Sequence, residues 1–541
     1  MRVSTRREFL ATSSLAVAGV GLGLARPAHS LPLRSSQPVA AFFPDLLDPA
    51  TLRTLALGGI DAARSAGATY ADIRVANRRH LEIFVNGIYP YSNIGFDVSY
   101  GLRVLVDGAW GFVYDFAPTP DAVVRAARTA VSTARGIAKI GGRVPAMTPA
   151  PVVTGEWTTP VAIDPFAVSP DDHVSVYGAY VSAGQRVPDG LAEALFCWST
   201  ETRVFASSEG SLVTQQLMHA EPRVGVGVMF EGTDSLGMYV TDFAPASAGF
   251  EIALGTHLQD RVKEATEEVA QFFSYPVANV EVGRYEAVFD GTSVGALLGA
   301  TINPALELDR VLGHHADDSG SSFLGPVTDV LGHRLFSPQL TVSAGRSAPL
   351  FGAAKWDDEG CATKAFPLID HGTVVDYFTT RTTASALTSW YASQGKAAHT
   401  CGSAVTLSPV RSPSGRASQL TMASGTSGTS LETLTQRISN GMLVRATTHV
   451  VSDQQLANSA CYPNLLFEVK HGRITRRLRH AGMQFSTKRL WQSLTTVGDA
   501  TTAQCRLHQS TVDQPWAKVK QAITAPAAHF REIDVIQLEQ Y

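Results

Sequence analysis

Apolar and polar positions follow two different periods along the first part of the chain. Helical spacing of apolar residues predicts one helix over residues 49–66, ending at Gly67, and a second over residues 119–135. Alternation of apolar and polar residues predicts short, half-buried strands between them, over residues 70–75, 81–85, 101–106 and 109–114. The last two strands flank Asp107 and Gly108, a pair that favours the positive φ angles of a two-residue hairpin turn.

The rest of the chain predicts a linker and two further regions. Residues 136–165 lack periodicity and are rich in Gly, Pro, Thr and Ala, which is typical of a linker. A middle region carries strand patterns and a predicted helix over residues 258–273, and strand and turn patterns dominate from residue 285 onward. Residues 412–430 are dense in Ser, Gly and Thr and predict a mobile loop. We therefore predict an α+β fold with an N-terminal α+β domain (31–140), a middle domain (160–280) and a β-rich C-terminal domain (281–541) whose sheets are mostly antiparallel.

Composition narrows the classes of function. A chain of 541 residues exceeds what one hydrophobic core usually supports. The formal net charge is −4 and no polybasic run is present, which argues against a nucleic-acid partner. The five cysteines are odd in number, widely spaced and without a CxxC pair, so the sequence predicts neither a disulfide framework nor a zinc knuckle.

The first thirty residues carry a targeting pattern. Residues 5–10 read TRREFL, an apolar stretch follows over residues 15–25, and Ala28, His29 and Ser30 form a small-x-small cleavage pattern. This resembles a twin-arginine signal peptide over residues 1–30, and an ordinary secretory signal is the alternative. The apolar stretch is too short and too rich in glycine for a membrane span. We expect a protein exported to the periplasm or the extracellular space.

Common catalytic signatures are absent from the sequence. It contains no GxxxxGK[ST] loop, no GxGxxG between a strand and a helix, and no GxSxG, so nucleotide cradles and lipase-type nucleophiles have no local support. Histidines cluster at His314 and His315, with His333 further on. Adjacent histidines point in different directions, so a polar loop is the favoured interpretation and a metal site the alternative.

Five segments, in chain order, resemble the TldD/PmbA family. They read ADIRV (71–75), GLRVLVDGAWGF (101–112), WDDEG (356–360), LIDHG (368–372) and TVGD (496–499). The resemblance implies an N-terminal α+β domain, a middle domain and a β-rich C-terminal domain, and it places the chain among relatives of zinc metallopeptidases. From its residue types alone, the acidic stretch at Asp357, Asp358 and Glu359 is interpreted as a polar turn between strands, with a metal cage as the alternative.

In the TldD branch of this family, the helix corresponding to residues 297–310 carries HExxxH, whose histidines hold zinc and whose glutamate activates water. Alignment through the acidic tail at Glu307, Asp309 and Arg310 places Gly299, Ala300 and Pro304 at the histidine, glutamate and histidine positions. None of these three has a side chain that can bind zinc or act as a base. We therefore expect no catalytic residue and no metal ligand in this motif, although zinc is the cofactor of the family.

The family's third zinc ligand is a cysteine near the C-terminus. Cys505 lies at about that place, but its neighbours Gln504 and Arg506 are not the glycines that flank the ligand in the family. The residues predicted to remain as a cleft are Glu307, Asp309, Arg310 and Cys505. The alternative for the first three is a solvated helix end.

Three hypotheses follow for function. The first is a non-catalytic, PmbA-like subunit, a pseudopeptidase that acts in peptide proteolysis beside a TldD-type catalytic paralogue, binds a peptide, or both, as a homo- or hetero-oligomer. The second is an active metallopeptidase with displaced ligands chosen from His314, His315, His333 and Cys505. The third is a stand-alone exported binding module without a role in proteolysis.

Overall fold

The computed structural model describes residues 30–538 except 87–89, 117, 143, 145, 229–236, 243, 317–318, 407–410 and 514–515. The predicted signal peptide, apart from Ser30, lies outside the described residues. Among the described residues, each helix is too short or too polar to cross a bilayer. The five cysteines form no disulfide with one another.

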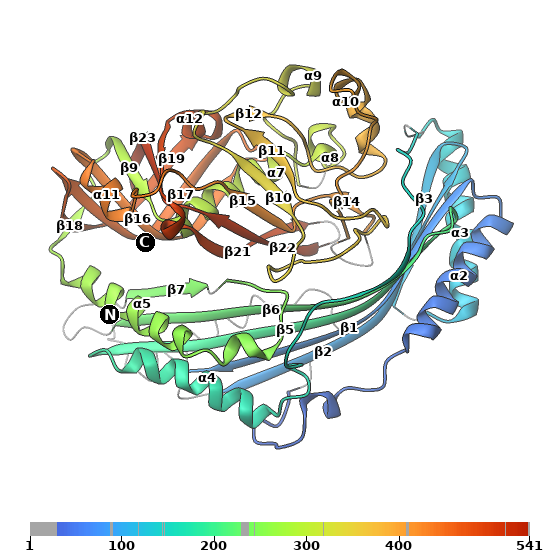
Figure 1. Ribbon diagram of the computed structural model, residues 1–541, viewed down its shortest axis with the longest axis horizontal. Helices are drawn as coiled ribbons and strands as arrows, with labels where there is room; N and C mark the ends of the chain where they lie inside the picture. Colours follow the sequence, from blue (N-terminus) through green and yellow to red (C-terminus); the bar gives the residue numbers. More distant parts are fainter. Residues whose placement is uncertain are drawn as a thin grey trace.

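Seven strands of the described chain form a long curved sheet (Figure 1), in the order β3-β2-β1-β5-β6-β4 with β7 beside β6. Their bounds are β1 Tyr70–Val85, β2 Tyr91–Val106, β3 Ala109–Asp115, β4 Thr154–Thr158, β5 Gly190–Ser207, β6 Leu212–Val228 and β7 Gly237–Asp242. The predicted hairpin turn is confirmed, because Asp107 and Gly108 both have positive φ. The segments predicted as separate strands over residues 70–75 and 81–85 are one continuous strand, β1, which pairs with β2 and β5 along its length.

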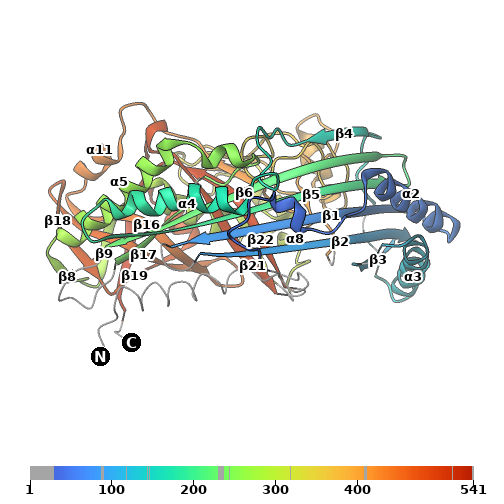
Figure 2. The ribbon, with the colours of Figure 1, turned by 90° about the horizontal axis from the view of Figure 1, so that it is seen from below.

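Helices cover one face of this sheet. α2 (Pro49–Ser65) and α3 (Pro120–Lys139) lie at one end, and α4 (Pro170–Gln185) and α5 (Thr256–Ser274) lie at the other (Figure 2). α2, α3 and α4 each begin with proline after a capping residue, Asp48, Thr119 or Ser169, whose side chain accepts a hydrogen bond from the first turn. Odd-numbered β1 residues such as Ile73 and Leu81 belong to the cores under these helices. Even-numbered β1 residues therefore face the other way, toward the C-terminal domain.

The C-terminal domain lies over the inner face of the curved sheet (Figure 1) and contains two mixed sheets. In the first, five strands close into a ring because β16 pairs with both β9 and β17. The ring strands are β9 Gly283–Phe289, β23 Ala528–Gln537, β19 Ala481–Ser486, β17 Asn458–Lys470 and β16 Asn440–Ser452; β8 Val277–Asn279, β18 Arg473–Arg479 and β20 Leu494–Val497 flank them. Most pairs are antiparallel, as predicted, but β9 with β16 and β8 with β18 are parallel.

The second C-terminal sheet has the order β12-β11-β10-β15-β22-β21. Its strands are β10 Val342–Gly345, β11 Phe366–Asp370, β12 Thr373–Val374, β15 Gln419–Met422, β21 Gln504–Asp513 and β22 Trp516–Ala525, and a separate pair is β13 Ala404–Val405 with β14 Ser414–Gly415. Short helical segments complete the described chain: η1 Val39–Phe42, η2 Phe250–Ala253, α6 Gly291–Ala300, α7 Ile302–Ala305, α8 Leu308–Val311, α9 Val327–Val330, η3 Thr383–Leu387, α10 Thr388–Ser393, α11 Leu431–Gln436, α12 Thr487–Gln492 and η4 Ala500–Thr502.

The fold is α+β, as predicted, with a different division along the chain. Residues 31–140 and 160–280, expected as separate domains, contribute strands to the same curved sheet. The expected linker over residues 136–165 contains β4, and the expected loop over residues 412–430 contains β14 and β15. Composition alone misses these strands because they are held by pairing with other strands: β4 with β6, β14 with β13, and β15 with β10 and β22.

Candidate functional site: the degenerate motif and the interface

The helix that carries the candidate motif begins at a tightly held cap. Asp290, at the end of β9, accepts hydrogen bonds from the N–H of Ser293 (2.8 Å) and from that of Ala446 (3.1 Å). α6 is buried over most of its length, which fixes its position between β16 and the β21–β22 hairpin. The helix-like run over residues 296–310 is divided into α6, α7 and α8.

Pro304 explains how this helical run breaks. It has no N–H to give to the carbonyl of Ala300 one turn earlier, and its ring clashes with that carbonyl in a regular helix. The break falls at Thr301 (φ −119°, ψ −71°). The freed carbonyl of Ala300 instead accepts a hydrogen bond from Ser452 Oγ at 3.0 Å. Proline at this position therefore changes the course of the helix as well as removing a donor atom.

The space beside Gly299 is filled by another histidine. A Cβ atom at Gly299 would lie 2.5 Å from Nδ1 and 2.6 Å from Cγ of His508, and 2.7 Å from Cδ1 of Ile523. His508 belongs to β21, and Ile523 to the neighbouring β22. Any side chain at residue 299, including the histidine of the resembling motif, would overlap these two side chains unless they moved.

His508 is held as a neutral side chain. Burial lowers its pKa to about 3, and the nearby positive charge of Arg506 lowers it further. Close by, Asn303 Nδ2 donates to Gln521 Oε1 at 2.7 Å, and both side chains are buried. His508, Asn303 and Gln521 are thus uncharged groups beside the degenerate motif, and Arg506 is a positive charge near them.

The acidic tail of the motif is buried, so the alternative of a solvated helix end is wrong. Glu307, Asp309 and Arg310 are only 2%, 8% and 5% exposed. Glu307 pairs with Arg416 (3.2 Å) and Arg310 (3.8 Å). Burial raises the pKa of Glu307 although both guanidinium groups oppose that shift. These contacts are structural, because they connect α8 to the segment that contains β14.

Asp309 and Arg310 hold the neighbouring loops. Asp309 Oδ2 accepts from the N–H of Gly415 at 2.7 Å, and Oδ1 lies 3.6 Å from His314 Nδ1. Arg310 donates to the carbonyl of Ser319. Both side chains therefore stabilise loops on either side of α8.

Cys505 faces away from the degenerate motif. Arg506 and His508 on β21 point toward α6, where they approach Gly295 and Gly299. Cys505 alternates with them and packs instead with Leu507, Ala522 and Phe351. Burial raises the pKa of the Cys505 thiol, so it is not held as a thiolate at neutral pH.

The other sequence-predicted donors are also dispersed. His314 is about half exposed and lies beside Asp309, His315 follows it in the loop after α8, and His333 is exposed after α9. Asp317 and Asp318 lie outside the described residues. Within residues 30–538, apart from the gaps named above, no three His, Cys, Asp or Glu side chains gather in a way that could hold a metal ion.

Three of the five segments meet in an ionic network that is buried or nearly buried except at Glu209 (the interface network: Asp72, Arg74, Arg103, Arg203, Asp358, Glu359, Arg381 and Glu209). Asp72 is fully buried and accepts from Arg103 Nε at 3.1 Å and Nη2 at 2.5 Å. Arg103 Nη2 also reaches Glu359 Oε1 of the C-terminal domain at 2.9 Å. Burial alone would raise the pKa of Asp72, but Arg103 and then Arg74 outweigh it, so this pKa is lowered. One arginine thus joins the curved sheet to the acidic turn.

The rest of the interface network repeats this pattern. Arg74 Nη1 donates to the carbonyl of Asp358 at 3.2 Å, and Arg203 pairs with the Asp358 carboxylate. Arg381 forms two parallel bonds with Glu209, at 2.7 and 2.9 Å, so charges cross the interface in both directions. The acidic segment is a turn, as predicted from its residue types, but a buried one at the interface rather than an exposed connection.

Gly360 lets this turn approach the sheet. Its φ is +76°, and a Cβ there would lie 2.5 Å from the Phe205 ring. Glycine is therefore required both by the backbone conformation and by the contact.

Two family models cover all five segments that resemble the TldD/PmbA family. Residues 71–134 match PmbA/TldA metallopeptidase domain 1, and residues 282–537 match the PmbA/TldA metallopeptidase C-terminal domain, which together make up more than half of the chain. The chain belongs to the PmbA/TldD family. The TldD/PmbA resemblance of the sequence segments is confirmed by these matches. No curated protein matches the chain.

Solved structures share the family fold at low sequence identity. A proposed modulator of DNA gyrase from Thermotoga maritima has a TM-score of 0.68 at 14% identity, covering 88% of this chain and 98% of its own. One from Bacteroides thetaiotaomicron has a TM-score of 0.67 at 16% identity, covering 91% and 100%. TldE from Thermococcus kodakarensis has a TM-score of 0.66 at 16% identity, covering 88% and 98%. These structures have the same fold as the PmbA/TldD member described here.

Sequence reasoning missed the interface network and His508. A usable signal for the network lies in β1, where charged residues occupy the even positions Asp72, Arg74, Arg78 and Glu82. Charges on every second position of a strand indicate one polar face, and that face needs partners if another domain covers it. His508 has no such signal, because its proximity to Gly299 depends on how β21 packs against α6.

The low pKa of His508 predicts a pH dependence of stability. Its folded pKa of about 3 lies below the ordinary value of about 6.5, so between these values the unfolded chain binds a proton that the folded chain does not. This contribution to stability is complete above about pH 6.5 and is lost as the pH falls, by about 1.4 kcal/mol per pH unit. We expect His508→Gln to lack that slope, as measured by urea unfolding of both proteins at pH 7, 6 and 5. Parallel curves for the two proteins would contradict it.

Proposed function

We propose that this protein is a non-catalytic PmbA/TldD-family subunit that acts in peptide proteolysis together with a TldD-type catalytic partner. The observation that carries the proposal is the contact between Gly299 and His508. The space where the family motif has a zinc-binding histidine is filled by the neutral His508 ring of β21. Zinc-dependent hydrolysis needs ligands that hold the metal and a base that takes a proton from water. Ala300 and Pro304 supply neither.

The active metallopeptidase with displaced ligands is the competing proposal. It would have to use His314, His315, His333 or Cys505. Cys505 points away from α6. His314 lies beside Asp309, in the loop that follows α8. This distribution favours the non-catalytic role.

Export remains part of the proposal. It rests on the TRREFL pattern and the small-x-small pattern at Ser30. A protein that leaves the cytoplasm by a twin-arginine route would meet a partner that is exported or travels with it. Secretion of a reporter fused to residues 1–35, and its loss on replacing Arg6 and Arg7 by lysine, would test this part separately.

The central experiment measures metal content and peptidase activity on the purified protein. We expect less than one tenth of a zinc ion per chain after dialysis against zinc, and no cleavage of a fluorogenic peptide library above the buffer rate. Individual alanine substitutions at His314, His315, His333 and Cys505 should leave these values unchanged. Stoichiometric zinc together with chelator-sensitive cleavage would refute the proposal.

A second measurement separates the subunit role from a stand-alone binding module. A paralogue with an intact HExxxH motif, encoded in the same genome, is co-expressed with this chain and purified through a tag on one of them. We expect the two chains to co-purify and peptide cleavage by the paralogue to rise in the complex. Failure to associate would favour the stand-alone module.

A further inference from the structure

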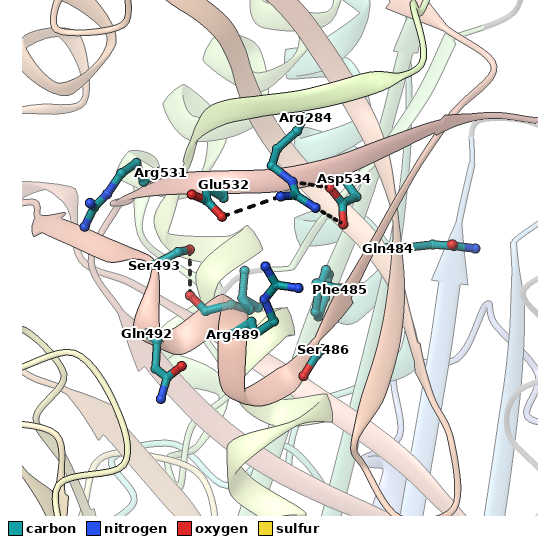
Figure 3. A pocket seen from close by; sticks show the side chains of 11 residues that line it. Arg284, Gln484, Phe485, Ser486, Arg489, Gln492, Ser493, Arg531, Glu532 and Asp534 are labelled. Carbon is teal, nitrogen blue, oxygen red and sulfur yellow. Dashed lines mark hydrogen bonds and ion pairs between the residues drawn. The ribbon is translucent and has the colours of Figure 1, made fainter.

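A polar pocket opens on the C-terminal domain where β19 and β23 separate. β19 pairs with β23 only as far as Gln484, opposite Asp534, and then continues through Ser486 into α12. The gap forms a pocket of about 280 Å³ (Figure 3). It adjoins a second recess of about 650 Å³, with which it shares Gln484, Phe485, Ser486 and Asp534. Together they make an elongated groove beside the strand ring.

The charges of the pocket do not balance. It is lined by Arg284, Arg489 and Arg531, against Glu532 and Asp534. Arg284 is already engaged, because it binds Asp534 at 2.7 Å and lies 4.0 Å from Glu532. Within the described part of the chain, neither Arg489 nor Arg531 has a carboxylate at ion-pair distance. The pocket therefore has an excess of one positive charge, which one monoanion would neutralise.

Arg489 is placed to receive that anion. Figure 3 shows its guanidinium group in the middle of the pocket, between Phe485 and Ser493, with Arg531 at the rim. Phe485 is 8% exposed and gives the pocket a rigid apolar wall. Ser486 also lines the pocket, and Figure 3 shows its hydroxyl directed away from the Arg489 guanidinium group. A guanidinium fork is suited to the planar geometry of a carboxylate.

The adjoining recess suits the chain that carries this carboxylate. Its walls carry small polar side chains, among them Ser452, Asn458 and Ser459, and the carboxylate of Asp453, which accepts hydrogen bonds from the N–H groups of Ala457 and Asn458. Ser452 also donates to the carbonyl of Ala300, so the recess rests on the degenerate helix. Polar walls of this kind can bind the amide groups of an extended peptide.

We propose that this groove binds the free C-terminal carboxylate of a peptide, with Arg489 as the anchor. The site is separate from the Gly299 contact, and binding there requires no metal. It does not depend on whether the protein is a catalytic or a non-catalytic family member.

The test is a fluorescence anisotropy titration with an N-terminally labelled hexapeptide, GSGSAL, as the free acid and as the C-terminal amide. We expect the acid to bind at least tenfold more tightly than the amide, because charge-assisted hydrogen bonds to one carboxylate are lost in the amide. Arg489→Met should remove the difference between the two peptides. Arg473→Met, at an exposed arginine of β18 outside the pocket, is the matched control and should leave the difference unchanged.

Competition distinguishes a peptide end from other anions. At equal ionic strength, acetyl-leucine should displace the labelled acid at lower concentration than inorganic phosphate. Equal binding of acid and amide, an unchanged preference in a folded Arg489→Met variant, or stronger displacement by phosphate would each overturn the proposal. Circular dichroism of each variant establishes that it is folded.

Discussion

Replacing Asp72 with asparagine is expected to lower the free energy of unfolding by about 3–5 kcal/mol, since it removes one partner of a buried charge network. Asp72 is completely buried and is bonded to Arg103, Arg74 and the hydroxyl of Tyr70. Asparagine keeps the shape but loses the negative charge, so two guanidinium groups would remain buried with too little compensation. The measurement is urea unfolding followed by circular dichroism.

A matched control for this variant lies on the surface of α5. Glu267 pairs with Lys263 at 3.6 Å, and both side chains are about half exposed. Glu267→Gln should change the unfolding free energy by less than about 0.5 kcal/mol, because water screens such pairs. The expectation for Asp72→Asn fails if its effect is no larger than that of the control.

A double-mutant cycle tests whether the interface network acts as one unit. Asp72 and Glu359 both bind the Arg103 guanidinium group. The effects of Asp72→Asn and Glu359→Gln should therefore not add, and the coupling should be at least 0.5 kcal/mol. Additive effects would mean that the sheet and the C-terminal domain are held independently at these two carboxylates.

Gly299→Ala is expected to destabilise the protein by about 1–3 kcal/mol, as overpacking of a filled core does. Helix propensity alone predicts the opposite sign, because alanine is favoured over glycine in a helix by about 1 kcal/mol. The overlap decides between them, since the new Cβ would lie 2.5 Å from the His508 ring and 2.7 Å from Ile523. Thermal and urea unfolding of the variant at pH 7 give the measurement.

Gly58 and His508 supply the controls for this prediction. Gly58 lies in α2 with no atom within 4 Å of an added Cβ, so Gly58→Ala should stabilise the protein by up to about 1 kcal/mol. In a His508→Ala background, Gly299→Ala should cost less than in the natural protein. If Gly299→Ala is neutral in both backgrounds, the contact with His508 does not constrain residue 299. If the contact holds, restoring a histidine at residue 299 would also require moving the His508 ring.

Local patterns predicted a large part of the fold. The helices α2, α3 and α5 begin and end within a few residues of their expected bounds, because helical apolar spacing and N-terminal caps are local properties. The turn at Asp107 and Gly108 was predictable for the same reason. The joining of two short strand patterns into β1 was not, since residues 76–80 are kept extended by β2 and β5 rather than by their own preferences.

Some features of the candidate site can likewise be predicted from the sequence, and others cannot. Once the motif is aligned, the sequence alone shows that Gly299, Ala300 and Pro304 lack side chains that could bind zinc or act as a base. The burial of Glu307 cannot be predicted in this way, because it depends on Arg416, more than a hundred residues later. The orientation of Cys505 cannot be predicted either, because it depends on which face of β21 meets α6.

The sequence by itself determined the family, the helices with clear caps, and the absence of zinc-binding side chains at three motif positions. Only the tertiary structure decided that His508 fills the place beside Gly299, that the first two sequence regions share one sheet, and that Asp72, Arg103 and Glu359 form one network. The physical reason is the separation in sequence between the residues that interact. Capping, turn conformation and donor chemistry are fixed by a few neighbouring residues, whereas the packing of Gly299 against His508 and the ion pair of Arg103 with Glu359 join residues more than two hundred positions apart.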